Sequence, residues 1–186
     1  MNLKWKTKEV VIVAMVAAVV GVVYTIMDYL YMPLSSLLGP VFMELTFGIY
    51  LLSASLPMYI VRKPGFALFG ALVTAFVNLL MGSAYGIQLI LAGTLQAVGM
   101  EIGYAVYKRY EGNMINMTVG AVLGALCVLG RDCVVFGYLT LGATTFTGIV
   151  IVRIISAVVI GMILTKGITA ALKKTGVLRG FKCAKV

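Results

Sequence analysis

The chain has 186 residues, of which 62% are hydrophobic and only 11% are charged, whereas a soluble domain carries about a quarter charged residues. Its apolar stretches, each about 20 residues long, use most of the length and leave no room for a soluble catalytic or nucleotide-binding domain. The formal net charge of +9 does not indicate nucleic acid binding, because the basic residues cluster at the ends of those stretches.

Six apolar stretches predict an all-α integral membrane protein, with six transmembrane helices in a single bundle and one membrane domain covering residues 1–186. In chain order, the predicted helices cover about residues 9–31, 42–61, 66–81, 87–107, 117–139 and 148–164. Residues 32–40 contain two prolines and a glycine, which predict a loop between the first two helices.

The Lys and Arg residues between the apolar stretches all fall on one side of the predicted membrane. They are Lys4, Lys6, Lys8, Arg62, Lys63, Lys108, Arg109, Lys166, Lys173, Lys174, Arg179, Lys182 and Lys185. The remaining three connections carry no Lys or Arg. The positive-inside rule therefore predicts that both termini are cytoplasmic.

The fifth predicted helix contains two adjacent charges, Arg131 and Asp132. If this pair formed a loop, the next apolar stretch would run over 133–164, which is too long for one crossing. Placing the pair inside a helix over 117–139 keeps the alternation of charge between the two sides. Residues 140–147 are then predicted to form an outer loop.

No residue pattern predicts catalysis, a metal site or a cofactor. The chain has no histidine, which is the commonest metal ligand and general base. Its three cysteines, Cys127, Cys133 and Cys183, match neither a disulfide framework nor a zinc-binding pattern. Phosphate-binding and nucleophile-elbow motifs are also missing, so the protein is not predicted to be an enzyme.

Polar side chains from different predicted helices share the outer half of the bilayer. They are Asp28, Glu44, Asn78, Gln96, Arg131, Asp132 and Arg153. Charge inside a membrane is costly and usually functional, so these residues predict an outward-facing cavity.

Alternatively, these groups pair with one another and hold the bundle together. Adjacent helical positions point about 100° apart, so Arg131 and Asp132 are not expected to face each other. Pairs between Arg131 and Glu44 or Asp28, and between Asp132 and Arg153, are open alternatives.

The charges inside the predicted helices do not balance. Two arginines oppose four acids, which are Asp28, Glu44, Glu101 and Asp132. Glu101 lies near the inner side, where it is expected to support helix packing or a cytoplasmic partner. Surplus acid in an outward-facing cavity favours a cationic or donor-rich ligand, because a lone buried ion needs a counter-charge.

Aromatic residues accompany these carboxylates. Tyr24, Asp28 and Tyr31 share one helical face, and Tyr85 lies in the predicted outer turn at the same level. A carboxylate flanked by aromatic rings suits a flat cationic or aminated ring. For Tyr31, Tyr85 and Tyr138, an interfacial aromatic belt is an alternative interpretation.

Small residues spaced four apart mark close helix contacts. Gly99 and Gly103, like Gly120 and Gly124, are expected to pack inside the bundle. The alanine surface formed by Ala14 and Ala18 on the first helix could pack internally or dock another membrane subunit.

Several motifs together resemble the substrate-binding (S) components of energy-coupling factor (ECF) transporters, most closely the YkoE type. The matching stretches are residues 8–11, 28–31, 39–40, 44–50, 62–67, 82–86 and 96–101. The resemblance covers most of the chain to about Tyr110 and is looser beyond it. The chain departs from the family pattern at Tyr50 and Tyr85, where tryptophans are frequent, and at Asn78, where an acid is expected.

The resemblance implies a six-helix membrane subunit that binds thiamine or its hydroxymethylpyrimidine precursor in a bacterial plasma membrane. It also implies a membrane coupling protein, docked at Ala14 and Ala18, and ABC-type ATPases as partners. The predicted substrate-binding residues are Tyr24, Asp28, Glu44, Asn78, Tyr85, Gln96, Asp132 and Arg153. The alternatives are a stand-alone carrier of organic cations and a structural membrane subunit.

Overall fold

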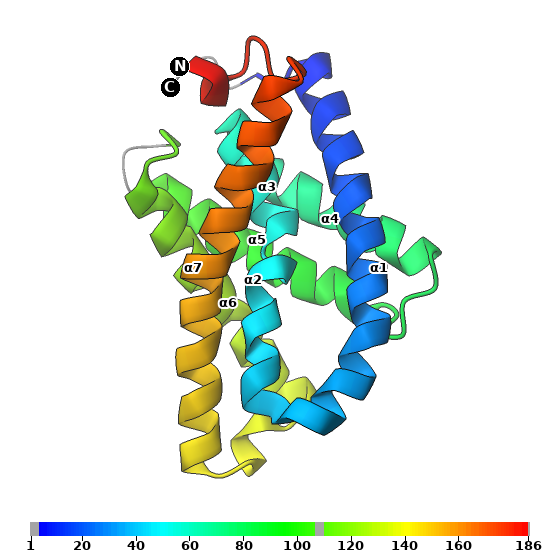
Figure 1. Cartoon of the computed structure of the whole chain (residues 1–186). Helices are drawn as coiled ribbons and strands as arrows, with labels where there is room; N and C mark the ends of the chain where they lie inside the picture. Colours follow the sequence, from blue (N-terminus) through cyan, green and yellow to red (C-terminus); the bar gives the residue numbers. More distant parts are fainter. Residues whose placement is uncertain (1–3, 107–109, 186) are drawn as a thin grey trace.

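The computed structural model describes residues 4–106 and 110–185, and every regular element in this part of the chain is a helix. The α-helices are α1 (Thr7–Met43), α2 (Phe47–Tyr50), α3 (Leu52–Val61), α4 (Phe66–Leu80), α5 (Gln88–Val106), α6 (Met114–Val135) and α7 (Ala143–Lys174). Short 3-10 helices cover Glu44–Thr46, Tyr138–Thr140 and Lys182–Lys185. Figure 1 shows them as one bundle, which confirms the predicted all-α architecture.

Within the described ranges, five helical segments are long and apolar enough to cross a membrane. They are Thr7–Tyr31, Pro33–Val61, Gln88–Val106, Met114–Val135 and Ala143–Lys174. α4 is apolar but shorter, as the predicted third helix is. Tyr107, the last residue of the predicted fourth helix, and the basic residues Lys108 and Arg109 lie outside the described residues. Both chain ends lie at the same end of the bundle, as an even number of crossings requires (Figure 1). That this end is cytoplasmic remains a prediction.

The predicted loop over residues 32–40 is wrong, because most of it is helical. α1 continues past Pro33 and breaks at Gly39, whose φ of 75° and ψ of 166° lie outside the helical region. A proline in a helix removes one backbone hydrogen bond and can bend the helix without ending it. Gly39 lacks a Cβ and therefore adopts the positive φ that turns the chain back towards α2.

The second predicted helix is divided at Leu51, between α2 and α3. The residues from Glu44 to Thr46 form a 3-10 turn before α2 begins. The region therefore has several irregular backbone positions beside the bundle interior, where other groups must satisfy the backbone hydrogen bonds.

α6 contains both Arg131 and Asp132, as the sequence predicted. The connection to α7 covers residues 136–142, so the predicted outer loop over 140–147 is wrong: it begins earlier, and residues 143–147 are already part of α7. α7 begins at Ala143 and ends at Lys174, so the helix extends beyond the predicted crossing of 148–164 at both ends. The last turn of α7 carries Lys173 and Lys174. Charged residues favour water over lipid but do not interrupt a helical backbone, so the helix can continue beyond the predicted crossing.

Glycines let α5 and α6 approach until their backbones touch. A Cβ added at Gly99 would lie 2.4 Å from the backbone nitrogen of Gly124, and one added at Gly103 would lie 2.3 Å from the Cα of Gly120. Each of these contacts allows only hydrogen at the glycine Cα. The predicted internal packing of these four glycines is confirmed, and the α5–α6 pair forms one wall of the cavity described below.

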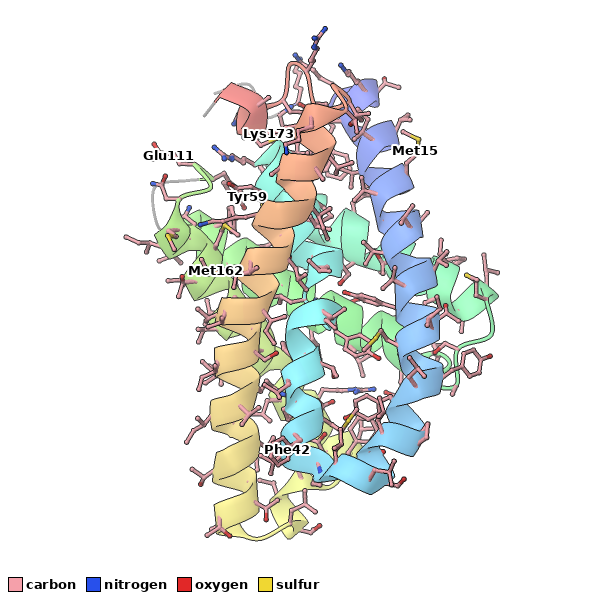
Figure 2. All side chains as sticks on the ribbon, in the orientation of Figure 1. Met15, Phe42, Tyr59, Glu111, Met162 and Lys173 are labelled. Atoms are coloured by element: carbon pink, nitrogen blue, oxygen red, sulfur yellow. The ribbon has the colours of Figure 1, made fainter. Side chains whose placement is uncertain are left out.

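The end of the bundle that carries the termini is filled by side chains. Its buried cluster comprises Ile12, Val13, Ile60, Val61, Phe66, Leu178, Phe181 and Cys183. An ion pair of 2.6 Å between Lys63 Nζ and Glu9 Oε2 joins the start of α1 to the turn after α3. Phe42 lies near the opposite end, where α1 turns into the second helix (Figure 2). The packed end thus leaves the other half of the bundle for a cavity.

Candidate functional site

A cavity of about 150 Å³ lies between α1, the α2–α3 segment, α4, α5, α6 and α7. All eight predicted substrate-binding residues line it: Tyr24, Asp28, Glu44, Asn78, Tyr85, Gln96, Asp132 and Arg153. The polar groups that the sequence placed at one depth of the bilayer are therefore neighbours in space.

Asp28 is a buried carboxylate that only neutral groups contact. Its Oδ1 accepts a hydrogen bond of 2.8 Å from the Tyr50 hydroxyl. Its Oδ2 accepts from Asn78 Nδ2 at 2.9 Å and from Ser83 Oγ at 2.5 Å. The residue is 1% exposed, and no Lys or Arg in the described chain forms an ion pair with it. Three donors stabilise the carboxylate but leave its negative charge uncompensated.

The other two carboxylates of the cavity share two arginines. Arg153 binds Glu44 through Nε at 2.6 Å and through Nη2 at 2.9 Å, and its Nη2 lies 2.8 Å from Asp132 Oδ2. Arg131 Nη1 lies 2.6 Å from Asp132 Oδ1, while its Nη2 donates to Gln88 Oε1 at 3.1 Å. The result is a neutral quartet of two acids and two bases, joining the start of the second helix to α6 and α7.

This quartet corrects two expectations and confirms a third. The expectation that Arg131 and Asp132 do not face each other is wrong, because the long arginine side chain bends back to its neighbour's carboxylate. The alternative pairing of Arg131 with Glu44 or Asp28 is also wrong, whereas the pairing of Asp132 with Arg153 is confirmed. Part of the polar set therefore does hold the bundle together.

Glu101 lies apart from this cavity and supports helix packing. One of its oxygens accepts a hydrogen bond of 3.0 Å from the backbone N–H of Ala67, in the first turn of α4. The other accepts from the Tyr110 hydroxyl at 3.1 Å. A carboxylate is stabilised at a helix N-terminus by the free N–H groups and the helix dipole. The charge surplus inside the cavity is thereby reduced to a single residue, Asp28.

Tyr24 and Gln96 line the cavity while they support the backbone break at Leu51. The Tyr24 hydroxyl accepts a hydrogen bond of 2.9 Å from the Ser53 N–H and donates to the Tyr50 carbonyl. Gln96 Nε2 donates to the same carbonyl at 2.8 Å and to Ser53 Oγ at 3.1 Å. These two side chains satisfy the freed backbone groups, which fixes Tyr50 in position to reach Asp28.

Aromatic rings form the walls near Asp28. Tyr31 and Tyr85 meet edge to face with ring centroids 6.2 Å apart, and Tyr24 and Tyr50 do so at 5.0 Å. Burial, with the nearby Tyr31 and Asp28, raises the pKa of Tyr85 to about 12, so its phenol is neutral at physiological pH. The aromatic residues predicted from the first helix therefore lie beside the uncompensated carboxylate.

Sequence reasoning did not select several polar or aromatic residues of the site. Among them are Phe47, Tyr50, Ser83 and Gln88. Ser83 lies in the turn that was predicted at the same depth of the bilayer as Asp28, so its predicted depth could have identified it as a site residue. Tyr50 gave no such signal, because its direction depends on the break at Leu51.

An uncompensated carboxylate in an aromatic cavity, inside a bundle of apolar helices, defines a membrane protein that binds a small molecule. Residues 8–127 match the family described as "ABC-type cobalt transport system, permease component", and the chain belongs to this family.

Two relatives refine this assignment. The chain is 27% identical, over 181 residues, to a candidate HMP/thiamine permease of Bacillus subtilis (strain 168), YkoE, with 97% of this chain and 91% of that protein covered. It also matches the crystal structure of an S-component of an ECF transporter with a TM-score of 0.90 and 27% identity, covering 95% of this chain and 90% of that one. The protein is thus a multi-pass membrane S component and not an enzyme, which confirms the resemblance noted from its motifs.

Proposed function

We propose that this S component binds thiamine or its hydroxymethylpyrimidine precursor (HMP) from outside the cell, for import driven by ATP hydrolysis in partner subunits. The observation that carries the proposal is the single negative charge left uncompensated in the cavity, at Asp28. A ligand that brings one positive charge or several N–H donors compensates that charge and contributes binding energy.

The chemistry of the cavity fits an aminopyrimidine. The exocyclic amine of this ring offers N–H donors to the Asp28 carboxylate, and its flat face can stack on tyrosines such as Tyr31 and Tyr85. In thiamine, the thiazolium ring adds a permanent positive charge. The name of the Bacillus subtilis relative points to the same pair of ligands.

Binding can be tested with the detergent-purified chain and a ligand panel. We expect thiamine, HMP or both to raise the melting temperature, because a ligand at 100 times its Kd stabilises the folded state by about 2.7 kcal/mol. Choline, a cation without a pyrimidine ring, is the control and should give a clearly smaller shift, because it can neither donate N–H hydrogen bonds to Asp28 nor stack on the tyrosines. The absence of any shift with thiamine and HMP would refute the proposal and favour a structural subunit.

A transport assay distinguishes the proposed S component from the alternative of a stand-alone carrier. In liposomes that contain only this chain, we expect no accumulation of thiamine, since an S component depends on its ATPase partners. Accumulation without those partners would favour a secondary carrier of organic cations.

The partner surface on α1 is a second part of the proposal, and it rests on the family resemblance. Ala14 and Ala18 are partly exposed in the half of α1 that is distant from the cavity. Small side chains there leave room for a helix of a coupling protein to approach closely.

Replacing Ala14 with tryptophan should abolish uptake in cells that contain the whole transporter, while ligand binding by the purified chain stays within about twofold of wild type. Uptake of labelled thiamine and ligand-induced melting shifts measure the two effects. Ile163→Trp, at a lipid-exposed position of α7, is the matched control. Normal uptake by Ala14→Trp would exclude this docking surface.

A further inference from the structure

Asp28 is already well supplied with hydrogen bonds before a ligand binds. Its Oδ2 accepts two, from Asn78 and Ser83, and its Oδ1 accepts one, from Tyr50. An ionised carboxylate offers about four acceptor positions, two on each oxygen, so the position that remains is on Oδ1. A ligand can therefore add one hydrogen bond of good geometry to this group. What the carboxylate still lacks is a positive charge.

The side chains of the cavity do not supply that charge. Besides Asp28, the charged residues that line the cavity in the described chain are those of the neutral quartet: Glu44, Arg131, Asp132 and Arg153. Both arginines of the quartet already bind carboxylates. The titratable groups that face Asp28 itself are the phenols of Tyr24, Tyr50 and Tyr85, which are neutral near physiological pH. The counter-charge must therefore come with the ligand.

The two ligands of the proposed function differ in charge. Thiamine carries a permanent positive charge on its thiazolium ring. HMP is a weak base, and its aminopyrimidine ring is neutral in mildly alkaline water. A neutral ligand would cover Asp28 and exclude water while the buried charge stays uncompensated, which is costly. A proton on the ring spreads positive charge to the exocyclic amine, whose N–H then forms a charge-assisted hydrogen bond with the remaining acceptor position.

We propose that HMP binds as its cation, with a proton from the solvent added to a ring nitrogen of the aminopyrimidine when the ligand binds beside Asp28. Thiamine, which brings its own positive charge, binds without proton uptake. The inference rests on the proposed function, because it concerns the same ligands and the same carboxylate. It makes positive charge, more than the number of N–H donors, the property that this cavity selects.

Calorimetry on the purified full chain can measure the proton uptake. Titrations at mildly alkaline pH, in two buffers that differ in their enthalpy of ionisation, give the number of protons bound with each ligand. We expect about one proton per HMP and about none per thiamine. Above the pKa of free HMP, the affinity for HMP should fall about tenfold per pH unit, because only its protonated form binds, whereas the affinity for thiamine should stay nearly constant.

Two further measurements show whether the ligand or Asp28 holds the proton. Protonation changes the ultraviolet absorption of an aminopyrimidine, so bound HMP should show the spectrum of acidified HMP. Asp28→Asn should remove both the proton uptake and the pH dependence of the remaining HMP binding. Glu111→Gln, at an exposed position before α6, is the control and should keep the proton uptake.

The opposite results would overturn the inference. If the Asp28 carboxyl took the proton, bound HMP would keep its neutral spectrum and Asp28→Asn would bind HMP as tightly as wild type. Binding of HMP without any proton uptake would also overturn the inference, and it would leave the proposed function intact. If neither HMP nor thiamine binds, both the inference and the proposed function fail.

Discussion

Replacing Asp28 with asparagine should raise the Kd for thiamine or HMP by about 100-fold or more. Truncating one partner of a buried charge-assisted contact costs about 2–5 kcal/mol. Asn keeps the size of the side chain but removes its negative charge, so the ligand loses its counter-charge inside a cavity of low dielectric constant. Calorimetric titration of the purified variant measures the change.

The stability of the empty protein separates this effect from misfolding. Asp28→Asn relieves a buried charge without a cation, but its Nδ2 cannot accept the hydrogen bonds that Asn78 and Ser83 donate to Asp28 Oδ2. Because the two effects oppose each other, the melting temperature of the ligand-free protein should change little. Glu111→Gln removes a carboxylate of the exposed connection before α6 and is the matched control, with unchanged affinity. Wild-type affinity in Asp28→Asn would show that the uncompensated carboxylate does not bind the ligand.

The location of the site could be predicted because each apolar helix crosses the bilayer once, so sequence position translates into depth. Asp28, near the end of one crossing, and Asn78, near the end of another, meet for this reason at 2.9 Å. The same logic placed Arg153 beside Asp132. The Lys and Arg residues between the helices and at the chain ends supplied the predicted direction of each crossing.

Which of the acids pairs with an arginine could not be predicted in the same way. The predicted depth in the bilayer is similar for Asp28, Glu44 and Asp132, yet only Asp28 lacks an arginine partner. Which acid pairs with Arg131 depends on side-chain rotamers, since its flexible stem can reach back to an adjacent residue. Helical geometry alone excluded that pair because it considers the direction of Cβ and ignores the length of the side chain.

Irregular backbone positions were the second feature that the sequence did not predict correctly. Proline and glycine in residues 32–40 predicted a loop, but the helix tolerates Pro33 and breaks only at Gly39. The break at Leu51 carries no Gly or Pro at that residue, and it is supported by Tyr24 and Gln96 from other helices. Such tertiary hydrogen bonds are invisible in a local sequence pattern, and this one determines where Tyr50 points.

Arg153 is expected to be the residue on which the stability of this half of the bundle depends most. Its guanidinium binds Glu44 twice and Asp132 once, and the residue is 3% exposed. In Arg153→Met, Asp132 keeps Arg131 but Glu44 keeps only the Tyr138 hydroxyl, at 3.2 Å. An uncompensated buried charge destabilises a fold by about 3–5 kcal/mol, so we expect a loss of that size.

A second substitution tests whether the isolated charge is the cause. In the double variant Glu44→Gln with Arg153→Met, no carboxylate is left unpaired at this position, and most of the lost stability should return. Arg179→Met, which removes an exposed arginine after α7, is the control and should change the free energy of unfolding by less than about 0.5 kcal/mol. Denaturant unfolding of the ligand-free proteins in detergent provides the four values. If the double variant is as unstable as Arg153→Met, the loss comes from packing around the guanidinium and not from the charge left on Glu44.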